Sequence, residues 1–178
     1  KLNESYKEID IYSGTEMDIK PDGSLDYPDD VLKELDYVIA AIHQSFNQSE
    51  DEIMKRLEVA CKNPYVRHIA HPTGRIIGRR PGYKPNIEKL MKLAEETNTI
   101  LEINANPKRL DLNAETVRKY PNVKLTINTD AHHTNHLEFM KYGVATAQKG
   151  FVAKDRVVNA LSREEFKSLI ENNIKLRK

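Results

Sequence analysis

A carboxylate and two imidazoles follow a short apolar run in the last third of the chain. Asp130, His132 and His133 come directly after residues 125–129, whose β-branched and apolar side chains are typical of a buried strand. If the extended backbone continues through Ala131, Asp130 and His132 point to the same side and could bind one cation or two adjacent cations. For this stretch alone, the alternative is that both residues cap the next helix or face solvent.

Four more strand-like runs carry a polar residue at or near their carboxyl ends. The runs, each with its polar residue, are 9–19 (Glu16), 36–42 (His43), 66–70 (His71) and 99–103 (Asn104). In a parallel sheet or barrel the carboxyl ends of all strands lie on one face, where the connecting loops form the active site. We therefore expect all five strand ends to converge on one site.

The side chains at these strand ends favour a hydrolytic metal site. The candidate ligands are Glu16, His43, His71, Asp130 and His132. Oxygen and imidazole ligands without thiolate suit Zn, Mn or Fe. One carboxylate can bridge two cations, and two cations can activate water while they clamp a phosphoester. Spacing alone does not distinguish this chemistry from that of a deaminase or an amidase on the same scaffold.

The loop after His71 contains three arginines, Arg75, Arg79 and Arg80. Guanidinium groups form paired hydrogen bonds with phosphate oxygens, so the loop could bind an anion beside the strand end. Asn104 is expected to contact the phosphate or to support a metal ligand. The alternative for the arginines is a solvated, flexible loop.

Helical patterns separate the strand-like runs and should position these side chains. Helices are predicted at 28–35, 49–62, 85–98, 114–120, 154–161 and 162–172, and residues 143–151 are predicted to form a strand or loop. His68 lies inside the third run and is predicted to be structural or solvent-facing. Because strands and helices alternate without a repeat or a linker, we expect an α/β fold in which residues 1–178 form one domain.

Composition limits the function classes. Hydrophobic residues make up 39% and charged residues 31% of 178 residues, as in a globular protein without membrane spans, so we expect a cytoplasmic location. A formal net charge of +1 does not favour a surface that binds nucleic acid all over, although a local basic patch remains open. The single Cys61 excludes an internal disulfide framework and a cysteine-rich zinc site.

Taken in chain order, the candidate motifs resemble the polymerase and histidinol phosphatase (PHP) domain. Among PHP domains, these motifs are most similar to those of the PHP domain at the C-terminus of bacterial family X DNA polymerases. The segments that carry the resemblance are Gly14-Thr15-Glu16, the strand ending in His43, residues 70–75 and 79–83, Glu102-Ile103-Asn104-Ala105, Arg109-Leu110-Asp111-Leu112, Asp130-Ala131-His132 and residues 143–151. As an ordered set these motifs cover nearly the whole chain.

The resemblance implies a distorted (β/α)7 barrel of the TIM-like kind with three metal ions. It also implies a manganese-dependent 3′–5′ exonuclease or related phosphoesterase that acts on DNA ends in repair. Family members open with a His-x-His pair on the first strand, and nothing before Glu16 matches it. Because the chain also starts at Lys1 without an initiator Met, and is short for a complete barrel of ~250 residues, we expect a partial barrel that lacks the N-terminal strands.

The resemblance assigns roles residue by residue. Glu16, His43 and His71 would complete one metal position, Glu16 would bridge to a second that keeps Asp130, and the third would retain only His132. We therefore expect one or two divalent ions, Mn or Zn, and weak or absent catalysis by the isolated chain. Glu16, Asp130 and His132 are the expected catalytic residues.

Two other functions remain open from the sequence. One is a hydrolase like histidinol-phosphate phosphatase; the other is a non-catalytic module that supports the polymerase or binds DNA. The expected partners are DNA, reached through the full-length polymerase, and the missing strands and polymerase domains of the same protein.

Overall fold

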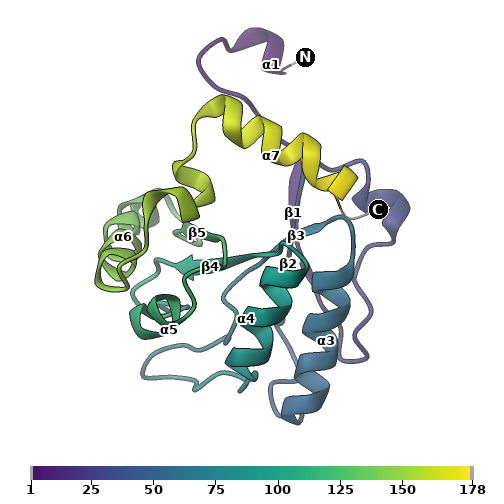
Figure 1. The fold of residues 1–178 in the computed structure, drawn as a ribbon, viewed down its shortest axis with the longest axis vertical. Coiled ribbons are helices and arrows are strands. Elements are labelled where there is room, and N and C mark those ends of the chain that lie inside the picture. Colours follow the sequence, from purple (N-terminus) through teal and green to yellow (C-terminus); the bar gives the residue numbers. More distant parts are fainter. Residues whose placement is uncertain (1, 177–178) are drawn as a thin grey trace.

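Five parallel strands form a single sheet in a computed structural model that describes residues 2–176 (Figure 1). The strands are β1 (Gly14–Asp18), β2 (Tyr37–Ala41), β3 (Val66–Ile69), β4 (Ile100–Asn104) and β5 (Leu125–Asn128). Each strand pairs with the next one along the chain. This order, in which every connection steps to the adjacent strand, confirms the α/β prediction and is consistent with part of a barrel.

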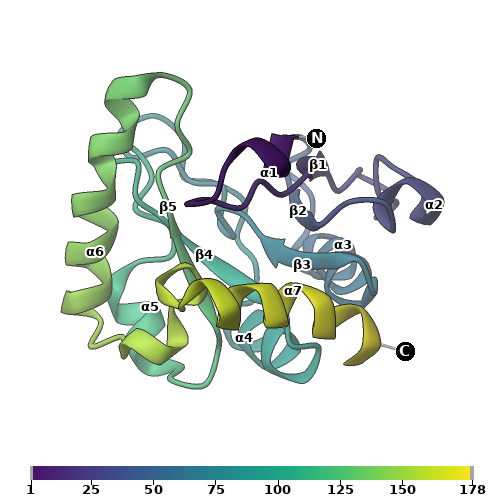
Figure 2. The ribbon, with the colours of Figure 1, turned by 90° about the horizontal axis from the view of Figure 1, so that it is seen from above.

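The helices lie on both sides of this sheet. In chain order the α-helices are α1 (Leu2–Ser5), α2 (Asp29–Leu32), α3 (Glu50–Lys62), α4 (Ile87–Glu96), α5 (Ala114–Lys119), α6 (Met140–Lys149) and α7 (Arg163–Leu176), and the 3-10 helices are η1 (Thr134–Phe139), η2 (Lys154–Arg156) and η3 (Val158–Ala160). Helices α3 and α4 pack side by side against one face, whereas α7 crosses the other face (Figures 1 and 2). Among residues 2–176, no helix has the length and apolar character that a membrane crossing needs.

The start of α3 shows how local sequence fixes an element next to the site. Ser49 caps the helix by accepting from the Glu52 backbone N–H, and the Glu52 carboxylate accepts from the Ser49 N–H in return. On the buried side of α3, Arg56 donates to the carbonyl oxygens of Ile19 and Gln44. Ile19 follows β1 and Gln44 lies beyond the end of β2. Arg56 therefore links the ends of the two strands that position Glu16 and His43.

The prediction of a strand or loop at residues 143–151 is wrong, because most of these residues belong to α6. A Cβ at Gly143 would lie only 2.4 Å from Cγ2 of Ile127 and 2.7 Å from Cβ of Ala105. The absent side chain therefore lets α6 pack directly against the ends of β5 and β4. The small, β-branched residues suggested extended structure, but close packing of the helix on the sheet favours them equally well.

Two smaller corrections concern the ends of the chain. The first strand begins at Gly14 and not at residue 9. Residues 154–161, predicted as one helix, form two 3-10 turns, and Val157 pairs in parallel with Leu125 at the edge of β5. Tertiary pairing with the sheet edge thus replaces the local helical preference.

Candidate metal centre

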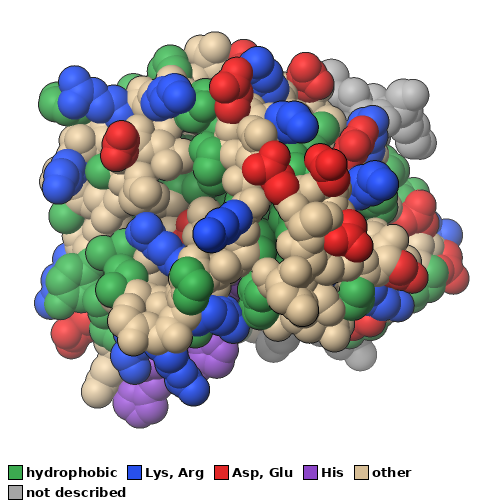
Figure 3. All heavy atoms as spheres, turned by 90° about the horizontal axis from the view of Figure 1, so that it is seen from below, with side chains coloured by type: hydrophobic (Ala, Val, Ile, Leu, Met, Phe, Trp, Pro, Cys, Tyr) green, Lys and Arg blue, Asp and Glu red, His purple; other side chains and the backbone are tan. Residues whose placement is uncertain are grey.

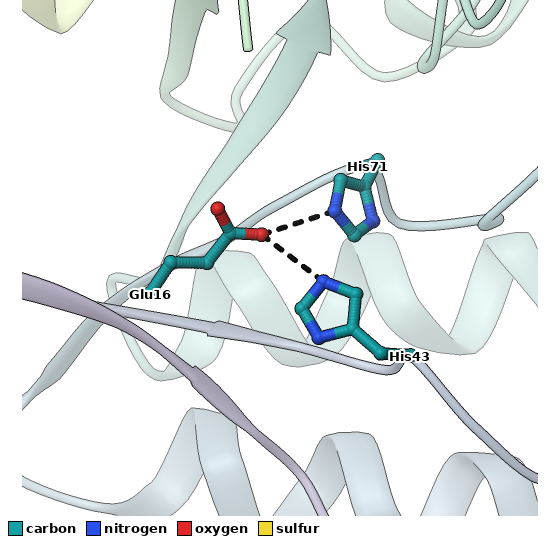
Figure 4. A group of neighbouring side chains, drawn as sticks. All are labelled: Glu16, His43 and His71. Atoms are coloured by element: carbon teal, nitrogen blue, oxygen red, sulfur yellow. Dashed lines mark hydrogen bonds and ion pairs between the residues drawn. The ribbon is translucent and has the colours of Figure 1, made fainter. Parts of the chain in front are cut away.

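Three predicted ligands meet at the carboxyl ends of neighbouring strands. Glu16 lies in β1. His43 lies two residues after the end of β2, and His71 lies two residues after the end of β3. One ligand atom from each of the three lies within 4.8 Å of the other two (Figure 4). Oε1 of Glu16 is 3.3 Å from Nε2 of His43 and 3.1 Å from Nε2 of His71. The three side chains therefore face one another, as ligands of a single cation do.

Electrostatics within the cluster stabilise the charged carboxylate. The hydrogen bonds from the His43 and His71 imidazoles hold the pKa of Glu16 well below its usual range. The Glu16 carboxylate in turn raises the pKa of His43, with a further contribution from Asp18. A carboxylate and two Nε2 atoms aimed at one point suit a divalent cation such as Zn or Mn, which would take the place of the protons.

A second carboxylate orients His43. Oδ1 of Asp18 contacts Nδ1 of His43, on the ring edge away from Glu16. Because an ionised carboxylate can only accept, this contact keeps a proton on Nδ1, so that loss of the Nε2 proton would expose the Nε2 lone pair to a metal. Asp18 had no predicted role, yet its spacing of two from Glu16 in a strand signals that both side chains lie on one face.

His71 is fixed through its backbone by a buried carboxylate. Its N–H donates to Oε2 of Glu102 at 2.7 Å, which holds the residue at an unusual φ of +30°. The ring is buried, and within residues 2–176 its Nδ1 has no hydrogen-bond partner. Glu102 also accepts from the side-chain amides of Asn104 and Asn128, each at 3.0 Å. Burial raises the pKa of Glu102, and these N–H donors oppose the rise.

Asp130 lies at the same cavity but outside the three-residue cluster. A cavity of about 260 Å³ is lined at its polar end by Glu16, His71, Glu102 and Asp130. Oδ2 of Asp130 accepts from Nε of Arg109 at 3.1 Å and from Nδ2 of Asn104 at 3.3 Å. Asn104 is fully buried and therefore links the Glu102 and Asp130 carboxylates.

The extended backbone expected through residue 131 is not present. Asp130 has a φ of +51°, so the chain turns where the strand was predicted to continue. His132 points outward with 79% of its side chain exposed, and its Nδ1 is 3.5 Å from Oδ1 of Asp130. The turn keeps Asp130 and His132 adjacent, but His132 is not among the ligand atoms that converge with Glu16.

The loop that carries Arg75, Arg79 and Arg80, here called the arginine loop, is held together by hydrogen bonds from its own side chains. Arg75 donates to the carbonyls of Arg109 and Leu110, and Arg80 donates to the carbonyl of Gly74. The Arg80 guanidinium also lies 4.0 Å from the centre of the Phe46 ring. Arg79 is exposed and has no side-chain hydrogen bond in the part of the chain that the structure describes. The alternative of a solvated, flexible loop therefore does not describe Arg75 and Arg80, whose side chains bond to backbone carbonyls.

His68 is structural, as predicted, and the solvent-facing alternative is wrong. The side chain is buried, and its Nε2 lies 3.0 Å from Oγ1 of Thr126. It lines the inner part of the same cavity, towards Tyr37 and Phe166.

The fold and the cluster define a class: an α/β protein whose parallel strand ends present a carboxylate and imidazoles to a candidate metal site. The chain is similar in sequence to two probable phosphatases, from Thermoanaerobacter sp. (strain X514) and Thermoanaerobacter pseudethanolicus (strain ATCC 33223 / 39E). Each is 29% identical over 170 residues, which make up 89% of this chain and 67% of the relative.

The chain is also similar in sequence to the DNA polymerase/3′-5′ exonuclease PolX of Bacillus subtilis (strain 168). Identity is 53% over 174 residues, or 97% of this chain, and the chain spans 30% of the length of that relative. No family model matches the chain. The chain is thus related to PolX and to proteins named as phosphatases, which supports a hydrolytic class of enzyme.

Proposed function

We propose that this chain is a PHP-type, metal-dependent phosphoesterase domain of a bacterial family X DNA polymerase, which removes nucleotides from DNA 3′ ends during repair. The observation that carries the proposal is the convergence of Glu16, His43 and His71 at three adjacent strand ends. The 53% identity to a polymerase/3′-5′ exonuclease supports the choice of DNA as substrate.

In this proposal Glu16, His43 and His71 hold one divalent ion, Mn or Zn. Asp130 would share a second ion with Glu16, and a third position would retain only His132. Bound ions would lower the pKa of the attacking water and neutralise phosphate charge. The chain's own contribution is to fix the ligands: Asp18 orients His43, and Glu102 holds the His71 backbone.

For the phosphate group, the geometry favours Arg109 and Arg79 over Arg75 and Arg80. Arg109 already contacts Asp130 through Nε, and its buried Nη1 has no partner within residues 2–176. A phosphoryl oxygen beside Asp130 would satisfy that donor. Arg75 and Arg80 support this arrangement indirectly, because their bonds to backbone carbonyls shape the loop and the Arg109 segment.

The relatives named as probable phosphatases favour a second candidate, hydrolysis of a small phosphomonoester at the same site. The two candidates share the metal centre and differ in substrate. Parallel assays with p-nitrophenyl phosphate and with a 5′-labelled oligonucleotide separate them.

The test begins with elemental analysis of metal content at near-neutral pH, where imidazoles can ligate. We expect roughly one bound ion per chain, lost both in Glu16→Ala and in the His43→Ala/His71→Ala double variant. Glu58→Ala is the matched control, because it removes an exposed carboxylate that pairs with Lys62 on the outer face of α3. Equal metal content in all proteins, or none in the unmodified chain, would contradict the proposed centre. Circular dichroism verifies that each variant is folded.

A further inference from the structure

Four aromatic side chains form a row that begins beside the candidate site. The row comprises His133, His136, Phe139 and Tyr142. Neighbouring ring centres are 6.1, 4.8 and 6.2 Å apart along the series, and the His136 and Phe139 rings are stacked at an interplanar angle of 20°. The row is linked to the cavity through His132, whose N–H donates to Nδ1 of His136 and whose own Nδ1 lies 3.5 Å from Oδ1 of Asp130, a residue that lines the cavity.

The helix type aligns the two central rings of the row. Residues Thr134–Phe139 form a 3-10 helix, in which side chains three residues apart eclipse one another. His136 and Phe139 lie in this helix at that interval, so their rings stack, whereas His133 precedes the helix and Tyr142 lies in α6, and both outer rings are tilted against their neighbours. Glu138 and Leu137 fall on the other two lines of the same helix. The only acid of this segment therefore lies off the row.

Backbone contacts hold two of the rings in place. Nδ1 of His133 accepts from the Asn135 N–H, and Nδ1 of His136 accepts from the His132 N–H, both at 3.2 Å. The rings stay accessible at both ends, because His133 is exposed and Tyr142 is 41% exposed. Ordered, accessible rings lose little entropy when a planar ligand stacks on them.

Cationic side chains lie at both ends of the row. Arg109 contacts Asp130 at the end near the cavity, and Nζ of Lys141 lies 5.3 Å from the centre of the Tyr142 ring at the other end. Figure 3 shows histidine side chains at the rim of one face with Lys and Arg side chains next to them. Planar rings with flanking cations are complementary to unstacked bases on a phosphate backbone.

We propose that this row is a stacking platform for single-stranded DNA, which leads the end of the strand towards Glu16, His43 and His71. Bases would stack on the exposed rings, while Arg109 and Lys141 contact phosphates. The delivery step rests on the proposed phosphoesterase function, but binding to the row does not. Binding measured without metal therefore separates the two proposals.

The experiment measures the affinity of a fluorescein-labelled 12-mer of thymidylate by anisotropy, in EDTA and low salt. We expect Tyr142→Ala and His136→Ala each to weaken binding about 5-fold or more, as loss of a stacking side chain does. Tyr142→Phe, which keeps the ring, should bind like the unmodified chain. Phe151→Ala is the matched control, because Phe151 is 73% exposed just beyond the opposite end of α6. A blunt duplex should bind more weakly than the single strand.

Three results would overturn the platform. The first is equal binding by Tyr142→Ala and Phe151→Ala, and the second is loss of binding in Tyr142→Phe. The third is a dimer, seen by analytical ultracentrifugation, that Tyr142→Ala dissociates while oligonucleotide binding stays unchanged. Oligonucleotide binding through the row in a chain that binds no divalent metal would keep the platform and reject the proposed metal centre.

Discussion

Asp18 and His43 form a carboxylate–imidazole pair at the rim of the cluster, with the Asp18 carboxylate on Nδ1 and Glu16 on Nε2 of the same ring. The contact joins the last residue of β1 to the loop that follows β2. It fixes both the orientation of the ring and the nitrogen that carries the proton. Metal-binding histidines are commonly held in this way, and the partner adds to the affinity of the site.

Replacement of Asp18 should therefore weaken metal binding without removing a ligand. We expect Asp18→Ala to lower the affinity for Mn or Zn about 10- to 100-fold, measured by isothermal titration calorimetry. Asp18→Asn should retain most of the affinity, because its carbonyl oxygen can still accept from Nδ1. Asp26→Ala removes a nearby exposed carboxylate that contacts Lys20 instead, and it serves as control. Equal losses in Asp18→Ala and Asp26→Ala would indicate a general charge effect.

Replacement of Glu102 should lower the stability of the fold, because its carboxylate accepts hydrogen bonds from three residues. Glu102→Ala removes the acceptor of the buried His71 N–H and one acceptor each of the Asn104 and Asn128 side-chain amides. We expect the free energy of unfolding in urea to fall by at least about 2 kcal/mol. Glu102→Gln keeps one acceptor oxygen and should give an intermediate loss. If Glu102→Ala were as stable as the exposed control Glu58→Ala, the hydrogen-bond network would not be a source of stability.

His68 should make stability depend on pH. Burial lowers its pKa from 6.5 to about 3. Between these values the unfolded chain binds a proton that the folded chain does not, so the free energy of unfolding decreases as the pH falls below about 6.5. The expected contribution is up to about 1.4 kcal/mol per pH unit. Among its charged neighbours, Glu16 raises the pKa of His68 and His71 lowers it.

Urea unfolding at pH 7, 6 and 5 measures this effect, with His68→Gln as the comparison. The glutamine can still contact Oγ1 of Thr126 but binds no proton in this range. The stability difference between the unmodified chain and the variant should shrink as the pH falls. Parallel pH dependence in the two proteins would show that His68 is not the group responsible.

The arginine loop offers a paired test of structure against substrate binding. Arg75→Ala removes the bonds to the Arg109 and Leu110 carbonyls and should lower the free energy of unfolding by about 1–3 kcal/mol. Arg79→Ala should change stability by less than about 0.5 kcal/mol, because its side chain is exposed. Only Arg79→Ala should weaken oligonucleotide binding while stability stays constant. The reverse pattern would restore Arg75 as the phosphate contact.

The sequence by itself predicted the five strands of the sheet and the convergence of Glu16, His43 and His71, although it placed the start of β1 too early. Runs such as residues 36–42 and 66–70 are apolar over the length of a strand. This local pattern predicted that His43 follows the end of β2 and that His71 follows the end of β3. Because parallel strands place their carboxyl ends on one face, the convergence with Glu16 followed from topology and needed no knowledge of individual contacts.

Only the tertiary structure decided which other side chains serve the site. Asp18 reaches His43 across 25 residues, Glu102 reaches His71 across 31, and Arg75 bonds Leu110 across 35. The positive φ of Asp130 likewise replaced the extended geometry that its neighbours predicted. Local sequence sets the period of a strand or helix, but hydrogen bonds between distant segments depend on strand register and on the paths of the loops, which the folded chain fixes as a whole.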